Sequence, residues 1–383
     1  MSDSITNTAN MANRIEVSAI VQEACAQSSQ RDGAENTMWQ SAWSMVASIN
    51  SRFASVPSAP DPAMLDMDMH DLWHMYWHGA VNTEPDSPKL DRLALHVIQA
   101  REQGVLARIS KTSDSKGQGS QGGAGDETTT EGERLQAVTS DGGRIWTDLP
   151  FLVRDMTAHW TNDCAAMSSS QRLSGAQFLA LLAAAGAAAD DALCGIALVL
   201  LREALETPRP LGHLAPTGRD SRRQMRDLSV AELLPAANAW LFTAGRKLVQ
   251  LSDAERNQFP VEVGRLGELL LSSPPPDAAS SGGVLWELPQ HGGFSPQRWT
   301  WWLRRLGEIA SLAARDDHAN EVGEGGRSLT SLVEGMMDNV LLIAAQTNGP
   351  VGQASQRSGG LVTHRPPMRL LGPDRPAAAG TGN

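Results

Sequence analysis

The stretch SPQRWTWWLRRLGEIASLAAR, residues 295–315, carries the clearest structural signal in this sequence. Ser295 is a favourable N-cap residue, and Pro296 suits the first position of a helix. Arg304, Arg305 and Glu308 fall on one side of this helix, where they can pair. The other side is apolar, because hydrophobic residues recur every three or four positions, as one helix face requires: Trp299, Trp302, Leu303, Leu306, Ile309, Ala310 and Ala313. The stretch therefore predicts an amphipathic helix with a buried apolar face.

The same period extends outward along most of the chain. Residues 229–250 begin with Ser229 and Glu232 at the spacing of a capping box, in which the two side chains satisfy each other's backbone N–H groups. Segments of the same character predict further helices near residues 14–29, 37–54, 65–80, 88–103, 148–167, 172–188, 190–206, 256–271 and 328–346. Segments that alternate apolar and polar residues are nearly absent, so we expect no sheet.

Capping residues predict where three of these helices begin. Ser252 with Glu255, and Ser331 with Glu334, repeat the capping-box spacing. Asp190 is expected to cap the helix that follows it. That helix is apolar nearly all round, which is typical of the centre of a fold. The pattern as a whole predicts an all-α fold, a single globular multi-helix domain of roughly ten helices.

Low-complexity stretches divide the chain. Residues 110–132 (SKTSDSKGQGSQGGAGDETTTEG) lack apolar anchors, and the tail is rich in Gly, Pro, Ser and Arg. Such stretches bury too little apolar surface to offset the entropy lost on ordering. We therefore predict a disordered N-terminus at 1–13, a helical domain at 14–347 with a disordered insertion at 110–132 and loops at 207–227 and 272–293, and a disordered tail at 348–383.

The net charge and the cysteine content limit the binding partners and the cellular compartment that we expect. The formal net charge of −11 argues against attraction to nucleic acid or to an anionic membrane surface. The three cysteines are far apart, so we expect a reducing compartment, cytoplasmic with a nuclear location as the alternative. The longest apolar run, residues 176–189, is too short to span a bilayer and stops at two aspartates. No membrane association is expected, and the N-terminus does not resemble a signal peptide.

A histidine-rich helix is the most suggestive candidate for chemistry. In DMDMHDLWHMYWH, residues 66–78, His70, His74 and His78 are four apart and line up along one helix side. Histidines at that spacing can hold zinc or iron, and nearby aspartates could join them. The alternative is that the histidines flank the buried face of the helix and that the aspartates favour its N-terminus.

Catalytic residues cannot be named from the sequence. His159 and Asp163 are four apart and could pair, but Cys164 points about 100° away from Asp163, so a helix ion pair beside a buried thiol is favoured over a nucleophile and its base. Asp190 and Asp191 lack the second half of a DDxxD magnesium motif. Phosphate-loop, nucleophile-elbow and kinase signatures are missing, so no cofactor is predicted.

A group of arginines falls in the segment between two predicted helices. This segment holds Arg209, Arg219, Arg222, Arg223 and Arg226. In an acidic protein the group could bind a phosphate or an acidic partner. A solvated loop is the simpler interpretation, because charge runs usually face water.

Tryptophan is unusually frequent, with 11 residues against one tyrosine and six phenylalanines. Trp301 lies off the apolar stripe that contains its neighbours, so it could line a ligand pocket or pack on another helix. We take Trp301, Arg298 and Trp77 as candidate ligand-binding residues, with core packing as the alternative role for the tryptophans.

Several segments together resemble a family of uncharacterised helical proteins found mainly in filamentous fungi. These segments are LWHMYWHGAVN (72–82), LDRLALHVIQAREQG (90–104), IWTDLPFL (145–152), LLREALE (200–206) and FSPQRWTWWLRRLGEIA (294–310). The resemblance implies an all-helical fold and a fungal, intracellular setting. It supplies no catalytic residues, because the family has no assigned activity.

Two functions remain open. The first is a non-catalytic interaction or scaffold protein with a protein partner, since no catalytic site assembles from the sequence. The alternative is an accessory protein or enzyme of fungal secondary-metabolite biosynthesis that binds a small apolar molecule in a Trp-lined cavity. An apolar cavity with a few convergent polar groups near Trp301 would favour the alternative.

Overall fold

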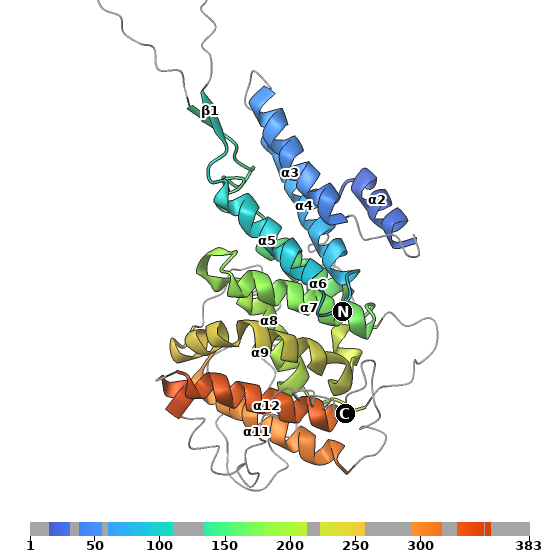
Figure 1. Ribbon diagram of the computed structural model, residues 1–383, viewed down its shortest axis with the longest axis vertical. Helices are drawn as coiled ribbons and strands as arrows, with labels where there is room; N and C mark the ends of the chain where they lie inside the picture. Colours follow the sequence, from blue (N-terminus) through green and yellow to red (C-terminus); the bar gives the residue numbers. More distant parts are fainter. Residues whose placement is uncertain are drawn as a thin grey trace, which may run out of the picture.

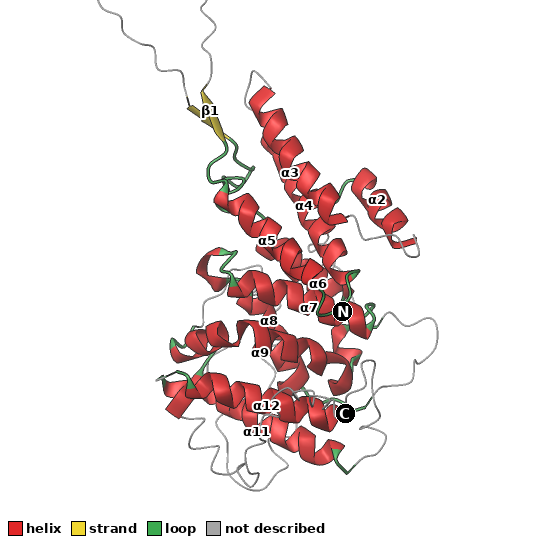
Figure 2. Ribbon diagram, viewed as in Figure 1, coloured by secondary structure: helices red, strands yellow, loops and turns green. Residues whose placement is uncertain are grey.

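The computed structural model describes residues 15–30, 38–55, 60–109, 134–212, 223–256, 293–315, 328–347 and 349–353. Across these residues helices dominate, which confirms the all-α fold (Figure 2). The α-helices are α2 (Ala19–Gln30), α3 (Met38–Ser55), α4 (Pro62–Val81), α5 (Pro88–Glu102), α6 (Leu152–Asp163), α7 (Ser169–Ala184), α8 (Cys194–Leu201), α9 (Val230–Asp253), α11 (Pro296–Ala313) and α12 (Leu329–Ala345).

The helices stack from one end of the molecule to the other. Figure 1 shows α2 to α5 at one end and α7, α9, α12 and α11 following one another towards the other end. Contacts follow this order, since α4 packs on α3, α6 and α7, α7 packs on α9, and α9 packs on α12, which in turn packs on α11. Every residue of α8 is buried, which confirms that this segment lies at the centre of the fold.

Local capping explains where most helices begin. Ser295 accepts a hydrogen bond from the backbone N–H of Arg298 at 3.1 Å, with Pro296 in the first helical position. The capping box of Ser229 and Glu232 is present at the start of α9. Ser168 and Gln171 form a second box at the start of α7. These side chains occupy backbone N–H groups that a helix cannot satisfy within itself.

Three of the predicted helix starts are wrong. Ser252 lies in the last turn of α9, where its hydroxyl donates to the carbonyl of Leu248 at 2.8 Å. Helix α12 begins three residues earlier than its predicted cap, because Ser328 accepts from the backbone N–H of Ser331 at 3.2 Å. Asp190 lies in a 3₁₀ turn, Ala189–Asp191, with a left-handed φ of 53°, so it cannot cap α8.

A short antiparallel ladder corrects the expectation of no sheet. Strand β1 (Ala107–Ile109) pairs with β2 (Arg134–Gln136), with Arg108 opposite Leu135. The segment between them contains the predicted insertion 110–132, which lies outside the described residues. Three-residue strands are too short to show the alternation by which strands are recognised in a sequence.

Other predictions also fall outside the described residues. They concern segment 1–13, most of helix 256–271 and of loop 272–293, and most of the tail at 348–383. The loop predicted at 207–227 is described at its ends, where Met225–Asp227 forms a 3₁₀ turn. The division into one domain at 14–347 stays a prediction. Among the described residues, no helix is long and apolar enough to cross a membrane.

Candidate functional site

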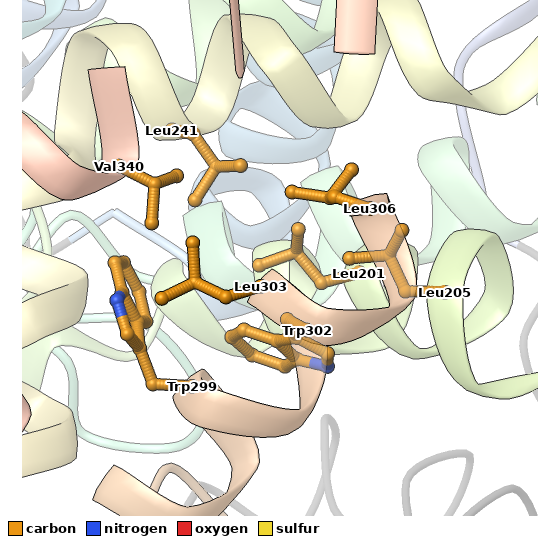
Figure 3. Close-up of a pocket in the computed structure, with 8 residues that line it drawn as sticks. All are labelled: Leu201, Leu205, Leu241, Trp299, Trp302, Leu303, Leu306 and Val340. Carbon is orange, nitrogen blue, oxygen red and sulfur yellow. The ribbon is translucent and has the colours of Figure 1, made fainter. Parts of the chain in front are cut away.

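An apolar pocket lies where the end of α8 meets α9, α11 and α12. It is small, with room for about one water molecule. Figure 3 shows the indoles of Trp299 and Trp302 on either side of Leu303. The residues that line the pocket are all apolar: Leu201, Leu205, Leu241, Trp299, Trp302, Leu303, Leu306 and Val340.

A π-helical turn shapes one wall of this pocket. After α8 the chain continues as a π-helix over Arg202–Glu206, and the backbone N–H of Thr207 bonds to the carbonyl of Arg202 at 3.1 Å. Single π-turns are rare in helices and are frequent at functional sites. The wider turn leaves Leu205 facing the pocket while Glu206 reaches the neighbouring helix α11.

Glu206 gathers the polar groups at the edge of the pocket. Its carboxylate accepts a hydrogen bond from Trp302 Nε1 at 2.7 Å and lies 2.8 Å from Arg298 Nε and 3.1 Å from Arg202 Nε. All three ionised side chains are nearly buried. Burial lowers the pKa of Arg202, and the carboxylate of Glu206 opposes that shift. These polar groups adjoin the pocket through Trp302, while the residues that line it are all apolar.

The structure separates the three candidate ligand-binding residues. Arg298 lies at the edge of the pocket, tied to Glu206. Trp301 is half-buried against the core but does not line the pocket. Trp77 lies on α4, among the histidines described below. The tryptophans that line the pocket are Trp299 and Trp302, from the buried stripe of α11. From the sequence these two residues could be assigned only to core packing, because the residue pattern of one helix does not show where a gap between several helices will form.

A second polar cluster joins α4 to α6. Nδ1 of His74 lies 3.4 Å from Nε2 of His159, and Nδ1 of His159 lies 3.5 Å from Oδ2 of Asp163. Trp77 stacks on His159 with ring centroids 5.7 Å apart, and its indole N–H donates to Oδ2 of Asp163 at 3.3 Å. The pairing of His159 with Asp163 agrees with their spacing on one helix.

Burial makes the histidines of this cluster hard to protonate. Burial and, to a smaller extent, the nearby rings of His159 and His78 lower the pKa of His74 to about 4, while Asp163 acts in the opposite direction. Burial also lowers the pKa of His78, whose ring centroid lies 6.5 Å from that of His74. Near neutral pH the imidazole of His74 is therefore uncharged and can act as a nitrogen ligand or a hydrogen-bond partner.

His70 faces a different set of partners from the other two histidines of α4. Its Nδ1 lies 2.6 Å from Oδ2 of the fully buried Asp155, and its ring stacks on Phe151 with centroids 4.5 Å apart. The guanidinium of Arg154 lies 2.8 Å from its Nε2. Within the described ranges, no three His, Cys, Asp or Glu side chains surround a common point as a metal set would.

The three cysteines are buried, and two residues of the arginine group form ion pairs. Burial raises the pKa of Cys164 to about 12. Arg209 was expected on a solvated loop, but its side chain is buried and paired with Glu203. Arg223 pairs with Glu232, the residue that caps α9, at 2.9 Å. Arg219 and Arg222 lie outside the described residues.

Comparison with known proteins gives two matches. A family described as "Protein of unknown function (DUF3632)" matches residues 73–306. A protein of Penicillium oxalicum, "Oxopyrrolidines biosynthesis cluster protein G", is 35% identical over 268 residues, which cover 69% of this chain and 65% of that protein. The match therefore spans slightly less than two thirds of the relative. These findings confirm the resemblance to an uncharacterised fungal family. No solved structure matches the chain.

Proposed function

Because this chain belongs to the DUF3632 family of proteins of unknown function, and a relative is named for a biosynthesis cluster, we propose that it is an accessory protein of fungal secondary-metabolite biosynthesis. In this role it binds a small apolar molecule in the pocket between α8, α9, α11 and α12. The proposal departs from the scaffold interpretation, which no specific observation among the described residues favours.

The composition of the pocket is the observation that carries this proposal. Small-molecule sites are typically apolar concavities with a few polar groups that fix the orientation of the ligand. Here Trp299 and Trp302 offer flat apolar faces, and Glu206 with Arg298 lies beside the lining, bonded to the indole N–H of Trp302. Aromatic rings combine a large contact area with little conformational entropy to lose, so they suit the binding of flat apolar groups.

The size of the pocket sets a condition on binding. The pocket has room for about one water molecule, far less than the roughly 300–1,000 Å³ of typical ligand sites. A metabolite therefore enters only when a wall moves. We take Trp302 as this wall, because its indole N–H is bonded to Glu206, which does not line the pocket. Turning this side chain breaks its hydrogen bond to Glu206 and its ring contacts with Phe294 and Trp299.

The proposal is tested by deleting the gene and profiling the metabolites of the fungus. We expect one or more compounds to disappear or accumulate, and the wild-type gene to restore the profile. A variant that fills the pocket, Leu306→Phe, should fail to restore it while folding normally by circular dichroism. The matched control is Leu312→Phe on the same helix, where the side chain is 43% exposed and the extra volume projects into solvent.

The outcomes separate the two functions. An unchanged metabolite profile after deletion would reject a role in secondary metabolism and would favour the interpretation as a scaffold protein. If the profile changes but Leu306→Phe restores it as well as Leu312→Phe does, the role in metabolism stands and the pocket is not the binding site.

A further inference from the structure

We propose that the ligand of the apolar pocket is a neutral, flat molecule with an N–H or O–H donor, which it gives to Glu206 in place of Trp302. This inference rests on the proposed function, because it concerns the same pocket and the same movement of Trp302. It makes Glu206 the residue that selects the ligand, although Glu206 does not line the closed pocket. A molecule of the same shape without such a donor should bind more weakly.

Trp302 and Arg298 share one carboxylate oxygen of Glu206. This oxygen, Oε1, accepts a hydrogen bond from Trp302 Nε1 at 2.7 Å and lies 2.8 Å from Nε of Arg298. The other oxygen, Oε2, lies 3.1 Å from Nε of Arg202. When Trp302 turns to open the pocket, Oε1 therefore keeps Arg298 but loses the indole N–H. The lost donor belongs to the side chain whose place the ligand takes.

Burial makes the loss of this donor costly. Only 12% of the Glu206 side chain is exposed, so bulk water has little access to its carboxylate. A buried acceptor that loses its donor carries a cost that an exposed acceptor avoids by bonding to water. A ligand that donates to Oε1 removes this cost, whereas a ligand with only C–H groups in that place leaves it.

The charges around Glu206 define the kind of donor that fits. A carboxylate only accepts hydrogen bonds, so a carbonyl or ether oxygen of the ligand would face a negatively charged oxygen here. A cationic amine is also unfavourable, because Arg202 and Arg298 already lie against the carboxylate. Burial and the charge of Arg298 both lower the pKa of Arg202, while Glu206 raises it. The group that fits is a neutral donor on an apolar body, such as a ring N–H or a phenolic O–H.

The test compares two probes of the same shape that differ only in the donor. Indole has a ring N–H, and indene has a CH₂ group in the same place. Binding of each probe to the full chain is measured by isothermal titration calorimetry. We expect indole to bind at least about tenfold more tightly than indene, because it makes a hydrogen bond to a charged group that indene cannot make. Leu306→Phe should abolish binding of indole, and the control Leu312→Phe should leave it unchanged.

The indole N–H signal of Trp302 in the NMR spectrum gives a second measurement on the parent chain, which does not depend on whether Leu306→Phe folds. The signal is assigned by its loss in Trp302→Phe. Binding of the indole probe should shift this signal, because the bond to Glu206 breaks when Trp302 turns. The signal of Trp160, which is buried on α6 and does not line the pocket, should stay where it is.

The outcomes separate this inference from the proposed function. If indene binds as tightly as indole and shifts the Trp302 signal equally, the pocket takes apolar ligands and the selective role of Glu206 is overturned. If neither probe binds or shifts that signal, the pocket does not open, and the proposed binding site is overturned together with this inference. Binding of indole that leaves the Trp302 signal unchanged also overturns the inference, because the probe then lies elsewhere.

Discussion

Trp302 on α11 donates its indole N–H to Glu206 at 2.7 Å, across 96 residues of sequence. This bond joins the π-helical turn after α8 to the helix that supplies both tryptophans of the pocket. The carboxylate at its other end also holds Arg202 and Arg298, so one side chain organises the polar edge of an otherwise apolar site.

Replacing Trp302 with phenylalanine should therefore destabilise the protein more than the same change at Trp299. Both indoles are buried in the pocket wall, but no described residue accepts a hydrogen bond from Trp299 Nε1. A hydrogen bond to a charged group contributes about 1.5–3 kcal/mol, so the two variants should differ by about 2 kcal/mol in free energy of unfolding. Urea denaturation measures this difference. Equal losses would show that the bond to Glu206 contributes little.

Replacing Glu206 with glutamine should cost more stability than removing an exposed carboxylate. The change takes away the negative charge that two nearly buried guanidinium groups share. Breaking a buried pair in this way costs about 3–5 kcal/mol. The control is Glu308→Gln, which removes the partner of Arg304 and Arg305 on the exposed side of α11 and should cost about 0.5 kcal/mol. A similar small loss for both variants would contradict the proposed organising role of Glu206.

Acidification should destabilise the folded protein through His74. The pKa of this residue is about 4 in the folded state, against an ordinary value of 6.5. At pH values between about 4 and 6.5, His74 binds a proton in the unfolded chain but not in the folded chain. The free energy of unfolding therefore falls as the pH falls from about 6.5 to about 4. Melting temperatures measured against pH with chelator present should fall less steeply for His74→Gln. Parallel curves would show that burial and the nearby rings of His159 and His78 do not suppress the protonation of His74, which Asp163 alone favours.

The cysteines should not react in the native protein. The thiolate is the reactive form, and burial raises the pKa of Cys25 to about 11 and that of Cys194 to about 12. At pH 8 we expect a thiol reagent to label none of the three cysteines in the folded chain and all three in denaturant. Rapid labelling of Cys164 in the native state would mean that its surroundings are more open than the structure indicates.

The sequence allowed most helices to be placed, because the signals that define a helix are local. Apolar residues three or four apart predicted α11 and α9, and the caps Ser295 and Ser229 gave their starts to within one residue. The same local reasoning gave the wrong cap where two possible capping residues lie close together in the sequence. Ser331 has capping-box spacing, but Ser328 just before it reaches the free N–H groups and caps α12 instead.

The candidate sites could be predicted only in part. Arg298 was singled out and lies at the edge of the pocket, while Glu206, which organises that edge, carried no signal in the sequence. His74 was singled out with two helix neighbours, yet the nitrogen closest to it comes from His159 on another helix.

Sequence alone determined that this chain folds as helices with tryptophan-rich buried faces, because helix formation and capping depend on residues within about four positions of one another. Tertiary structure alone decided which faces meet. The pairing of Trp302 with Glu206 and of His74 with His159 spans 96 and 85 residues, and it depends on how whole helices pack around a shared core. Packing of that kind sums many weak contacts, none of which is recorded in the spacing of residues along the chain.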